Sequence, residues 1–428
     1  MRILVVGTGA REHAIVHSLA AEGVHELHAA PGNPGIAAEA TLHPVDAVDP
    51  VAVAELAVGL GADLVVVGPE APLVAGVADA VREAGIPCFG PSAEAARLEG
   101  SKAFAKDVMA AAGVPTAAAH VCGTFDEVAH ALDAFGPPYV VKDDGLAAGK
   151  GVVVTSDRDA ALDHARAALG ARGADGRVVV EEFLDGPEVS LFCICDGASV
   201  VPLVAAQDFK RVGDDDAGPN TGGMGAYSPL DWAPSGLVGE VVDRIAQPTV
   251  DEMSRRGIPF AGVLYVGLAL TSRGTRVVEF NARFGDPETQ VVLARLRSPL
   301  SALMLAAATG GLAALPPLRW SDDAAVNVVV AAEGYPGAVR SGDPIGGIED
   351  AEAIEGVHVL HAGTALNRDG ELVSSGGRVL SVVAHGAGLA EARDAAYAGI
   401  ARIALDGSHH RSDIALKAVR GEVPVAGS

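Results

Sequence analysis

Over the first hundred residues, short apolar runs alternate with helical patterns, and this alternation limits the fold more than any other feature of the chain. It predicts strands and helices in turn at 3–6, 12–21, 26–30, 51–60, 64–67, 72–84 and 87–89. Such alternation is typical of a doubly wound parallel sheet, in which ligands bind at the carboxyl ends of the strands. The loops after these strands are therefore candidate binding segments.

The first of these loops, Gly7-Thr8-Gly9-Ala10-Arg11-Glu12, begins like a dinucleotide-binding fingerprint. Glu12 replaces the third glycine of that motif, and the second strand ends without the acidic residue that would bind a ribose, so we do not expect NAD. Two interpretations of the loop remain open. It is a phosphate-holding turn at a helix N-terminus, or a glycine turn that only leads from strand to helix.

Charge and composition narrow the class of protein. The 428 residues suggest about three domains, and 49% hydrophobic with only 4% aromatic residues fits an α/β protein with covered parallel strands. The 31 basic and 55 acidic residues give a formal charge of -24, which repels nucleic acid and anionic membranes. We expect neither as a partner. An anionic substrate must meet a local cluster of lysine, arginine and backbone N–H groups.

The cysteines and the start of the chain predict a cytoplasmic location. The four cysteines show no metal-binding spacing, and Cys193 and Cys195 lie in an apolar strand-like run, so we interpret all four as free thiols. The N-terminus has no signal-peptide pattern, and no apolar run is long enough to span a bilayer.

A glycine-rich loop marks the middle of the chain. After a helix at 102–112, the strands at 139–142 and 152–154 enclose Asp143 to Gly151. The loop differs from a Walker A motif because its spacing is one residue short, Gly151 replaces Ser/Thr, and a β-branched run follows. We predict a hairpin lid whose N–H groups and lysines contact phosphate.

Glu279 and Asn281 follow a strand-like run, and alternation places their side chains on one face. A carboxylate beside an amide oxygen suits Mg²⁺, which also takes water and substrate phosphates as ligands. The alternative is an exposed strand end rich in solvated polar residues.

Other polar segments lie between apolar strands. The strand at 177–186 ends in acidic residues, which are either ligand-binding or a solvated strand end. Strands at 191–195, 200–206 and 260–271 are expected to continue the same sheet toward Glu279. The polar loop at 207–227 is of a kind that is functional or disordered, and its aspartates at 214–216 are interpreted as solvated.

A linker at 310–317 precedes a small α+β C-terminal domain. Its predicted strands and helix are at 325–331, 357–361, 371–374, 378–384 and 389–403.

In this order, the motifs resemble those of the ATP-grasp superfamily and, within it, the glycinamide ribonucleotide synthetases (phosphoribosylamine–glycine ligases). The motifs are found at 9–13, 31–33, 68–73, 99–102, 144–151, 181–186, 219–229, 279–290, 361–364 and 376–380. The resemblance implies a Rossmann-like substrate domain at 1–100, an ATP-grasp domain at 101–324 with a lid subdomain at about 121–190, and a C-terminal domain at 325–428.

The resemblance also implies a reaction of purine biosynthesis. ATP, glycine and 5-phosphoribosylamine would give glycinamide ribonucleotide, ADP and phosphate through a glycyl phosphate, with Mg²⁺ or Mn²⁺ as the metal. A monomer or weak homodimer is expected. The nearest alternative is another ATP-grasp carboxylate–amine ligase or carboxylase, and a dehydrogenase or a non-catalytic nucleotide sensor is less consistent with the motifs.

Carried over position by position, the resemblance implies roles for named residues. The nucleotide would be bound by Lys102, Lys142, Gly145, Gly149, Lys150, Gly151, Glu181, Glu182, Phe183, Leu184 and Glu188, and the metal by Glu279 and Asn281. The substrates would be bound by Gly9, Arg11, Asn33, Glu70, Asp208, Gly223, Met224, Gly225 and Arg283, with Arg283, Asp208 and Lys142 also catalytic. Among these, Arg283 would hold glycine and the acyl phosphate, because its planar fork pairs with both. Gly267 and Leu268 stand where many ATP-grasp enzymes have an acid, which leaves more of the metal shell to phosphates and water.

Overall fold

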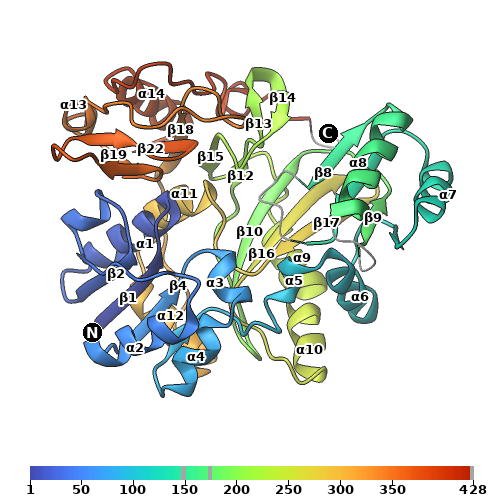
Figure 1. The fold of residues 1–428 in the computed structure, drawn as a ribbon, viewed down its shortest axis with the longest axis horizontal. Helices are drawn as coiled ribbons and strands as arrows, with labels where there is room; N and C mark the ends of the chain where they lie inside the picture. The colour runs from blue at the N-terminus through green and yellow to red at the C-terminus, as the bar shows by residue number, and fades with distance from the viewer. Residues whose placement is uncertain (146–150, 172–175, 425–428) are drawn as a thin grey trace.

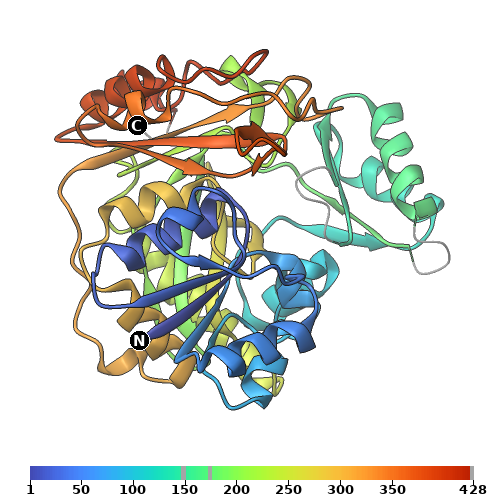
Figure 2. The same cartoon turned by 60° about the vertical axis from the view of Figure 1, so that its left-hand side comes forward.

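The computed structural model describes residues 1–145, 151–171 and 176–424. Gly149 and Lys150 of the predicted nucleotide site lie outside these ranges. Three parts of the chain surround a central region (Figure 1), and the part that contains β6–β9 extends to one side of the molecule (Figure 2).

The N-terminal part confirms the predicted parallel sheet. Its strand order is β3-β2-β1-β4-β5, with β1 (Arg2–Gly7), β2 (Glu26–Pro31), β3 (Thr41–Leu42), β4 (Leu64–Val67) and β5 (Cys88–Phe89). Helices α1 (Ala10–Ala20) and α2 (Pro50–Leu60) connect the strands. The prediction of a single helix at 72–84 was wrong. It is two helices, α3 (Glu70–Val74) and α4 (Val77–Glu83), because Gly76 between them has a left-handed φ of 90°.

The lid is an antiparallel sheet with two helices. Its order is β6-β9-β7-β8, with β6 (Ala119–Cys122), β7 (Tyr139–Asp143), β8 (Val152–Thr155) and β9 (Val178–Glu181), packed against α7 (Phe125–Phe135) and α8 (Arg158–Ala171). Strands β7 and β8 pair antiparallel from Tyr139 with Thr155 to Lys142 with Val152, which confirms the predicted hairpin.

A second antiparallel sheet carries the predicted metal ligands. Its order is β11-β10-β16-β17, with β10 (Glu188–Asp196), β11 (Val200–Pro202), β16 (Ala261–Thr271) and β17 (Gly274–Asn281). The expectation that these strands continue the sheet of β9 was wrong. The chain turns sharply after β9, where Gly186 has a φ of 85° and a Cβ would lie 2.0 Å from the Leu270 carbonyl oxygen.

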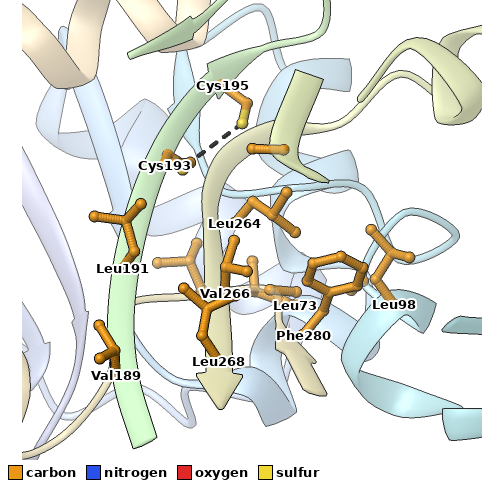
Figure 3. Close-up of a cluster of buried hydrophobic side chains, with 14 of the residues drawn as sticks. Leu73, Leu98, Val189, Leu191, Cys193, Cys195, Leu264, Val266, Leu268 and Phe280 are labelled. Carbon is orange, nitrogen blue, oxygen red and sulfur yellow. Dashed lines mark hydrogen bonds between the residues drawn. The ribbon is translucent and has the colours of Figure 1, made fainter. Parts of the chain in front are cut away.

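One face of this sheet is part of the main hydrophobic core (Figure 3). Alternate positions of β10 and β16 supply Val189, Leu191, Cys193, Cys195, Leu264, Val266 and Leu268, and they pack with Leu73 of α3 and Leu98 of α5 (Arg97–Gly100). The core therefore joins the N-terminal and central parts. All four cysteines are buried free thiols, as predicted, and burial raises the pKa of the Cys193 thiol to about 12.

The C-terminal sheet takes strands from two distant segments. Its order is β12-β15-β18-β22-β19, with β12 (Gln207–Asp208), β15 (Gly225–Ser228), β18 (Ala324–Ala331), β19 (Val357–His361) and β22 (Arg378–Gly386), and α14 (Leu389–Ile400) packs on it. A small α+β C-terminal part is confirmed. The polar loop at 207–227 is ordered, because its two ends form β12 and β15 at the edge of this sheet.

The remaining elements complete the layers. They are η1 (Ile36–Ala38), α6 (Lys102–Ala112), β13 (Arg211–Gly213), η3 (Asp214–Asp216), β14 (Ala217–Asn220), α9 (Leu237–Val241), η4 (Val242–Ala246), α10 (Gln247–Arg255), α11 (Glu288–Arg295), α12 (Leu300–Thr309), η5 (Leu312–Ala314), α13 (Ile348–Glu352), β20 (Thr364–Leu366), β21 (Leu372–Ser374) and α15 (Leu416–Val419). Among the described residues, no helix is long and apolar enough to cross a membrane.

The interpretation of aspartates 214–216 as merely solvated was also wrong. Arg411, which is 1% exposed, forms an ion pair with Asp216 at 2.8 Å, and the Ser412 amide donates to Asp214 at 2.8 Å. A buried guanidinium needs carboxylate partners, and the β13–β14 hairpin supplies one of them. The aspartates therefore fasten this hairpin to the C-terminal segment.

Candidate active site

Lys142 is buried at the end of β7, beside the central sheet. Its Nζ lies 2.8 Å from Glu181 Oε2 and donates to the Val278 carbonyl of β17 at 3.0 Å. Burial opposes the charge of Lys142, but Glu181 and Glu279 outweigh burial and raise its pKa. The side chain is therefore a fixed cation between the lid and the central sheet.

Lys102 lies in the first turn of α6, and its Nζ donates to the Gly145 carbonyl at 3.2 Å. The helix begins here because Ser101 Oγ accepts from the Phe104 amide at 3.1 Å. Asp144, at the end of β7, accepts from the Ala103 amide at 3.1 Å. The two predicted phosphate lysines thus come from elements that are tied to each other.

Glu181 has two lysine partners, one of which the sequence reasoning missed. Its Oε1 lies 3.0 Å from the Nζ of Lys106, which also donates to Thr116 Oγ1 at 2.9 Å. Burial lowers the pKa of Lys106 although Glu181 opposes this shift. The i,i+4 spacing of Lys102 and Lys106 places both on one face of α6, and that spacing was an available signal.

The other residues predicted to bind the nucleotide lie at a more exposed position. Glu182 accepts from the Ala118 amide at 3.0 Å and pairs with Arg273 at 2.9 Å. Phe183 is 45% exposed, and Glu188 pairs with Lys210. Leu184 follows Phe183 in the segment between β9 and β10. Nucleotide contact by this segment stays a prediction.

Glu279 and Asn281 lie on one face of β17, with buried Phe280 on the other. Among the described residues, neither side chain has a hydrogen-bond or ion-pair partner. Burial would raise the pKa of Glu279, but the positive charges of Lys210, Lys142 and Lys102 lower it.

This donor set fits a magnesium or manganese ion that is only partly held by protein. A carboxylate and an amide oxygen are suitable hard ligands. No group of three or more His, Cys, Asp or Glu in the described part of the chain could hold a metal ion by itself. The remaining ligands would be phosphates and water, as expected from Gly267 and Leu268 on the neighbouring strand.

Arg283 connects the central part to the N-terminal part. It pairs with Glu70 at 3.1 Å and with Glu99 at 2.9 Å, and it donates to the Phe284 carbonyl at 3.2 Å. Burial opposes the charge of Arg283, but Glu99 and Glu70 outweigh it and raise the pKa. Three of its five N–H groups are used, which leaves two that can face a carboxylate or phosphate. Glu99 was part of a recognised motif, but no role was assigned to it.

Asp208 and Lys210 lie at the start of the polar loop. Burial and the nearby Glu288 and Glu188 raise the pKa of Asp208 to about 7, although Lys210 lowers it. Lys210 had no predicted role, yet its charge acts on Glu279 more strongly than that of Lys142 or Lys102. A lysine between two expected substrate segments was the available signal.

The glycine segment after this loop is held by protein contacts. The Gly223 amide donates to Thr221 Oγ1 at 2.9 Å and the Met224 amide donates to the Phe209 carbonyl at 2.8 Å, while Gly225 lies in β15. Gly223 has a φ of 109°, and a Cβ there would lie 2.3 Å from Pro287 Cδ. These residues shape the loop, and their contact with substrate stays a prediction.

A cleft of about 470 Å³ lies between the N-terminal and C-terminal parts and is named here the substrate cleft. It is lined by two predicted residues, Gly9 and Asn33, and by Thr8, Gly32, Asp286, Ala362, Gly363, Thr364, Ser375, Gly376 and Arg378. Arg378 pairs with Asp286 at 3.0 Å and donates to the Gly222 carbonyl at 2.7 Å. It was part of a recognised motif, but no role was assigned to it.

Three residues expected at the phosphoribosyl group also support the walls of this cleft. Asn33 Nδ2 donates to the Thr8 carbonyl at 2.8 Å and to the His361 carbonyl at 2.9 Å. Arg11 is buried, and its Nε lies 2.5 Å from Glu12. The Gly9 amide donates to Glu12 Oε2 at 2.6 Å, so Glu12 takes the position that a phosphate would need at this turn. Of the two interpretations of the loop, this contact favours the glycine turn.

Three family models match successive parts of the chain. They are described as the N domain, the ATP-grasp (A) domain and the C domain of phosphoribosylglycinamide synthetase, and they match residues 1–99, 100–289 and 325–417.

Known proteins are similar to this chain over nearly its whole length. A phosphoribosylamine–glycine ligase of Streptomyces coelicolor is 68% identical over 421 residues, which cover 98% of this chain and 99% of that protein. The crystal structure of a phosphoribosylamine–glycine ligase from Thermotoga maritima is 34% identical, with a TM-score of 0.83, and the match covers 97% of this chain and 100% of that one. The biotin carboxylase domain of a Hydrogenobacter thermophilus 2-oxoglutarate carboxylase shares the fold at a TM-score of 0.70 and 17% identity, over 96% of this chain and 91% of that one. The chain belongs to the phosphoribosylglycinamide synthetase family.

Proposed function

We propose that this chain ligates glycine to 5-phosphoribosylamine in an ATP-dependent reaction, as the names of its relatives indicate, with the residues described above as its working parts. The observation that carries the proposal is a set of lysines around Glu279. Lys142 donates to the carbonyl of the preceding residue, Val278, at 3.0 Å, and the positive charges of Lys210, Lys142 and Lys102 lower the pKa of Glu279. A separate cleft lies between the N- and C-terminal parts. Lysines around one carboxylate suit a phosphate–metal site, and the cleft offers room for a second substrate.

In the first step, the glycine carboxylate attacks the γ-phosphorus of ATP, the bond to the β-phosphate oxygen breaks, and ADP leaves. Lys102 and Lys142 hold the α- and β-phosphates, and Glu279 and Asn281 hold Mg²⁺ or Mn²⁺. The metal, when bound, neutralises charge on the transferred phosphate. The remaining N–H groups of Arg283 bind the glycine carboxylate and then the acyl phosphate.

In the second step, the amine of phosphoribosylamine attacks the acyl carbon, a C–N bond forms, and phosphate leaves with the C–O bond electrons and takes up the proton that the amine loses. Asp208 and the loop with Gly223 to Gly225 flank the reacting groups. Arg11, Asn33 and Glu70 position the sugar phosphate, with Arg378 as an added candidate at the cleft. Gly9, whose amide is used by Glu12, contributes only the close approach of its backbone to the sugar. Catalysis rests on positioning and charge neutralisation.

The nearest alternative is another ATP-grasp carboxylate–amine ligase or a carboxylase. Similarity to carboxylases at 14–18% identity supports the fold alone, whereas the N- and C-domain models match this chain outside the ATP-binding part. We therefore keep the ligase and propose no carboxylase activity.

ADP release with each substrate omitted in turn tests the proposal. We expect release only when glycine and phosphoribosylamine are both present, with glycinamide ribonucleotide as the organic product. Turnover without glycine, or with bicarbonate in its place, would contradict the assignment.

We further propose that the protein works in the cytoplasm, which four buried free thiols support, as a monomer or weak homodimer. Light scattering over a range of concentrations tests the oligomeric state, and cell fractionation tests the location.

A further inference from the structure

A second cavity of about 400 Å³ lies where the N-terminal, central and C-terminal parts of the chain meet, and it shares no lining residue with the substrate cleft. We name it the junction cavity. One face of α1, the end of α11 and the strands β19 and β22 form its walls. These elements are neighbours in the molecule (Figure 1).

The junction cavity is lined by three imidazole rings, by apolar side chains and by the carboxylate of Glu22. The ring centroids of His17 and His358 lie 5.0 Å apart, and those of His358 and His385 lie 6.1 Å apart in a stacked arrangement. Two apolar residues of the same strands also line the cavity: Leu360 lies two positions after His358 on β19, and Val383 lies opposite His358 on β22. Flat rings over apolar side chains suit a planar heterocycle, because aromatic rings prefer to stack with an offset.

A cationic group lies in the same cavity. Arg297 follows α11 and is about half exposed. One of its nitrogens, Nη2, donates to Ser321 Oγ at 3.0 Å and lies 3.8 Å from Asp323 Oδ2, which leaves the N–H groups of Nε and Nη1 for a ligand. A guanidinium with remaining N–H groups pairs well with phosphate or carboxylate. The cavity therefore combines a stacking surface with an anion-binding group.

Gln290 links the junction cavity to the substrate cleft. It lines the junction cavity, is 2% exposed, and donates from Nε2 to Asp286 Oδ1 at 2.9 Å. Asp286 pairs through its other oxygen with Arg378, and both of these residues line the substrate cleft. Among the described residues, Gln290 Oε1 is buried without a hydrogen-bond donor, so a ligand that supplies an N–H would satisfy it.

We infer that the junction cavity binds a purine nucleoside monophosphate, and that this ligand changes the affinity of the substrate cleft through Gln290, Asp286 and Arg378. The base stacks on the histidines and its amino or imino N–H lies toward Gln290, while the phosphate pairs with Arg297. The binding site stands independently of the proposed function, and only the coupling rests on it. Coupling requires that the two sites stabilise the same arrangement of the chain.

Calorimetry with AMP and with IMP tests the binding site while a non-hydrolysable ATP analogue and Mg²⁺ fill the nucleotide site. We expect one additional site per chain, whose Kd rises at least about tenfold in His358→Ala and in Arg297→Ala. His130→Ala, at an exposed position of α7, is the matched control and should bind as the wild type does. Absence of binding up to about 1 mM would overturn the inference, as would a Kd in both cavity variants equal to that of the wild type. It would also be overturned if the nucleosides, which lack the phosphate, bound the wild type as tightly as AMP and IMP do.

Gln290→Met, which keeps side-chain length but removes the amide, tests the coupling. Because Gln290 also contacts the base, the variant should bind the nucleotide more weakly, so the nucleotide is added at a concentration that calorimetry shows to saturate the variant. The KM for phosphoribosylamine should change at least about threefold with the nucleotide in the wild type and should not change in the variant. An unchanged response would refute the path through Gln290. Loss of the glycine requirement in the ADP assay would refute the proposed function and leave the calorimetric result standing.

Discussion

Glu279 is the residue on which the proposed phosphate chemistry depends most. The positive charges of Lys102, Lys142 and Lys210, which come from three separate segments, lower the pKa of Glu279. Among the described residues, its carboxylate has no hydrogen-bond or ion-pair partner. A carboxylate surrounded by lysines stays ionised. It attracts a metal ion only when the phosphates of a nucleotide neutralise the positive charge of the lysines. Its charge therefore matters more than its shape.

Replacing Glu279 by Gln tests this role. We expect kcat to fall at least about 100-fold, because the variant removes charge where the metal must meet the transferred phosphate. Steady-state ADP release over a range of Mg²⁺ concentrations measures the effect. Glu371→Gln, at an exposed position of the C-terminal part, is the control. Near-normal turnover would mean that Glu279 and Asn281 have a structural role.

His13 illustrates a residue that contributes to stability in a pH-dependent manner. Burial, together with the nearby His361 and His17, lowers its pKa to about 3, and its Nδ1 accepts a hydrogen bond from the His361 amide at 2.8 Å. Glu39, at 3.8 Å, is too distant for a hydrogen bond to the ring. His13 therefore joins α1 to β19 only while it is neutral.

The sign of the pH effect follows from this low pKa. The unfolded chain, with an ordinary pKa of 6.5, binds the proton more readily, so the contribution of His13 is complete above pH 6.5 and is lost as pH falls toward 3. At pH 5 the loss is about 2 kcal/mol. Denaturant unfolding at pH 7.5 and pH 5 should show this drop, and His13→Gln should reduce it. An equal drop in both proteins would count against His13.

At the level of elements, helix α6 and strand β7 are positioned by each other. Asp144 at the end of β7 accepts hydrogen bonds from Ser101 Oγ at 3.0 Å and from the Ala103 amide at 3.1 Å. A carboxylate at a helix N-terminus satisfies an unpaired amide and complements the helix dipole. Lys102, in the same turn, is thereby oriented toward the glycine loop.

Asp144→Ala should loosen this connection without unfolding the protein. We expect the KM for ATP to rise roughly fivefold, since a lost cap of about 1 kcal/mol at the first turn displaces Lys102. Asp163→Ala, which removes an exposed carboxylate from α8, should leave the KM unchanged. If both variants have the wild-type KM, then Asp144 does not orient the lysine.

At the scale of the whole molecule, Arg378 joins parts that are far apart in sequence. It lies in β22 of the C-terminal part, and its guanidinium contacts Asp286 and the Gly222 carbonyl of the central part. Arg378 also lines the substrate cleft, where we propose that the second substrate binds, so the proposed site depends on the docking of the C-terminal part.

We expect Arg378→Lys to raise the KM for phosphoribosylamine at least about tenfold while the KM for ATP changes less than about threefold, because lysine keeps the charge but not the planar fork. Initial rates with each substrate varied in turn give both constants. A parallel rise in both KM values would indicate a general loss of structure. Arg319→Lys, outside the cleft, is a suitable control.

Local patterns were enough to predict most elements. Helix α6 and strand β4 begin and end where their apolar patterns do, and the hairpin of β7 and β8 follows from the glycine loop between two β-branched runs. Periodicity and turn residues act over a few positions, so they can be interpreted along the chain. The same holds for Glu279 and Asn281, whose common face depends only on alternation in β17.

Contacts between distant segments were decided by the tertiary structure alone. Glu181 lies between Lys106 and Lys142, β12 and β15 join the C-terminal sheet, and Arg411 pairs with Asp216. No local pattern specifies such partners, because each depends on how the sheets pack and on which buried charge still lacks a counter-charge. The sequence by itself determined the elements, the family resemblance and the candidate residues, whereas packing of the three parts decided which side chains meet in the substrate cleft and the junction cavity.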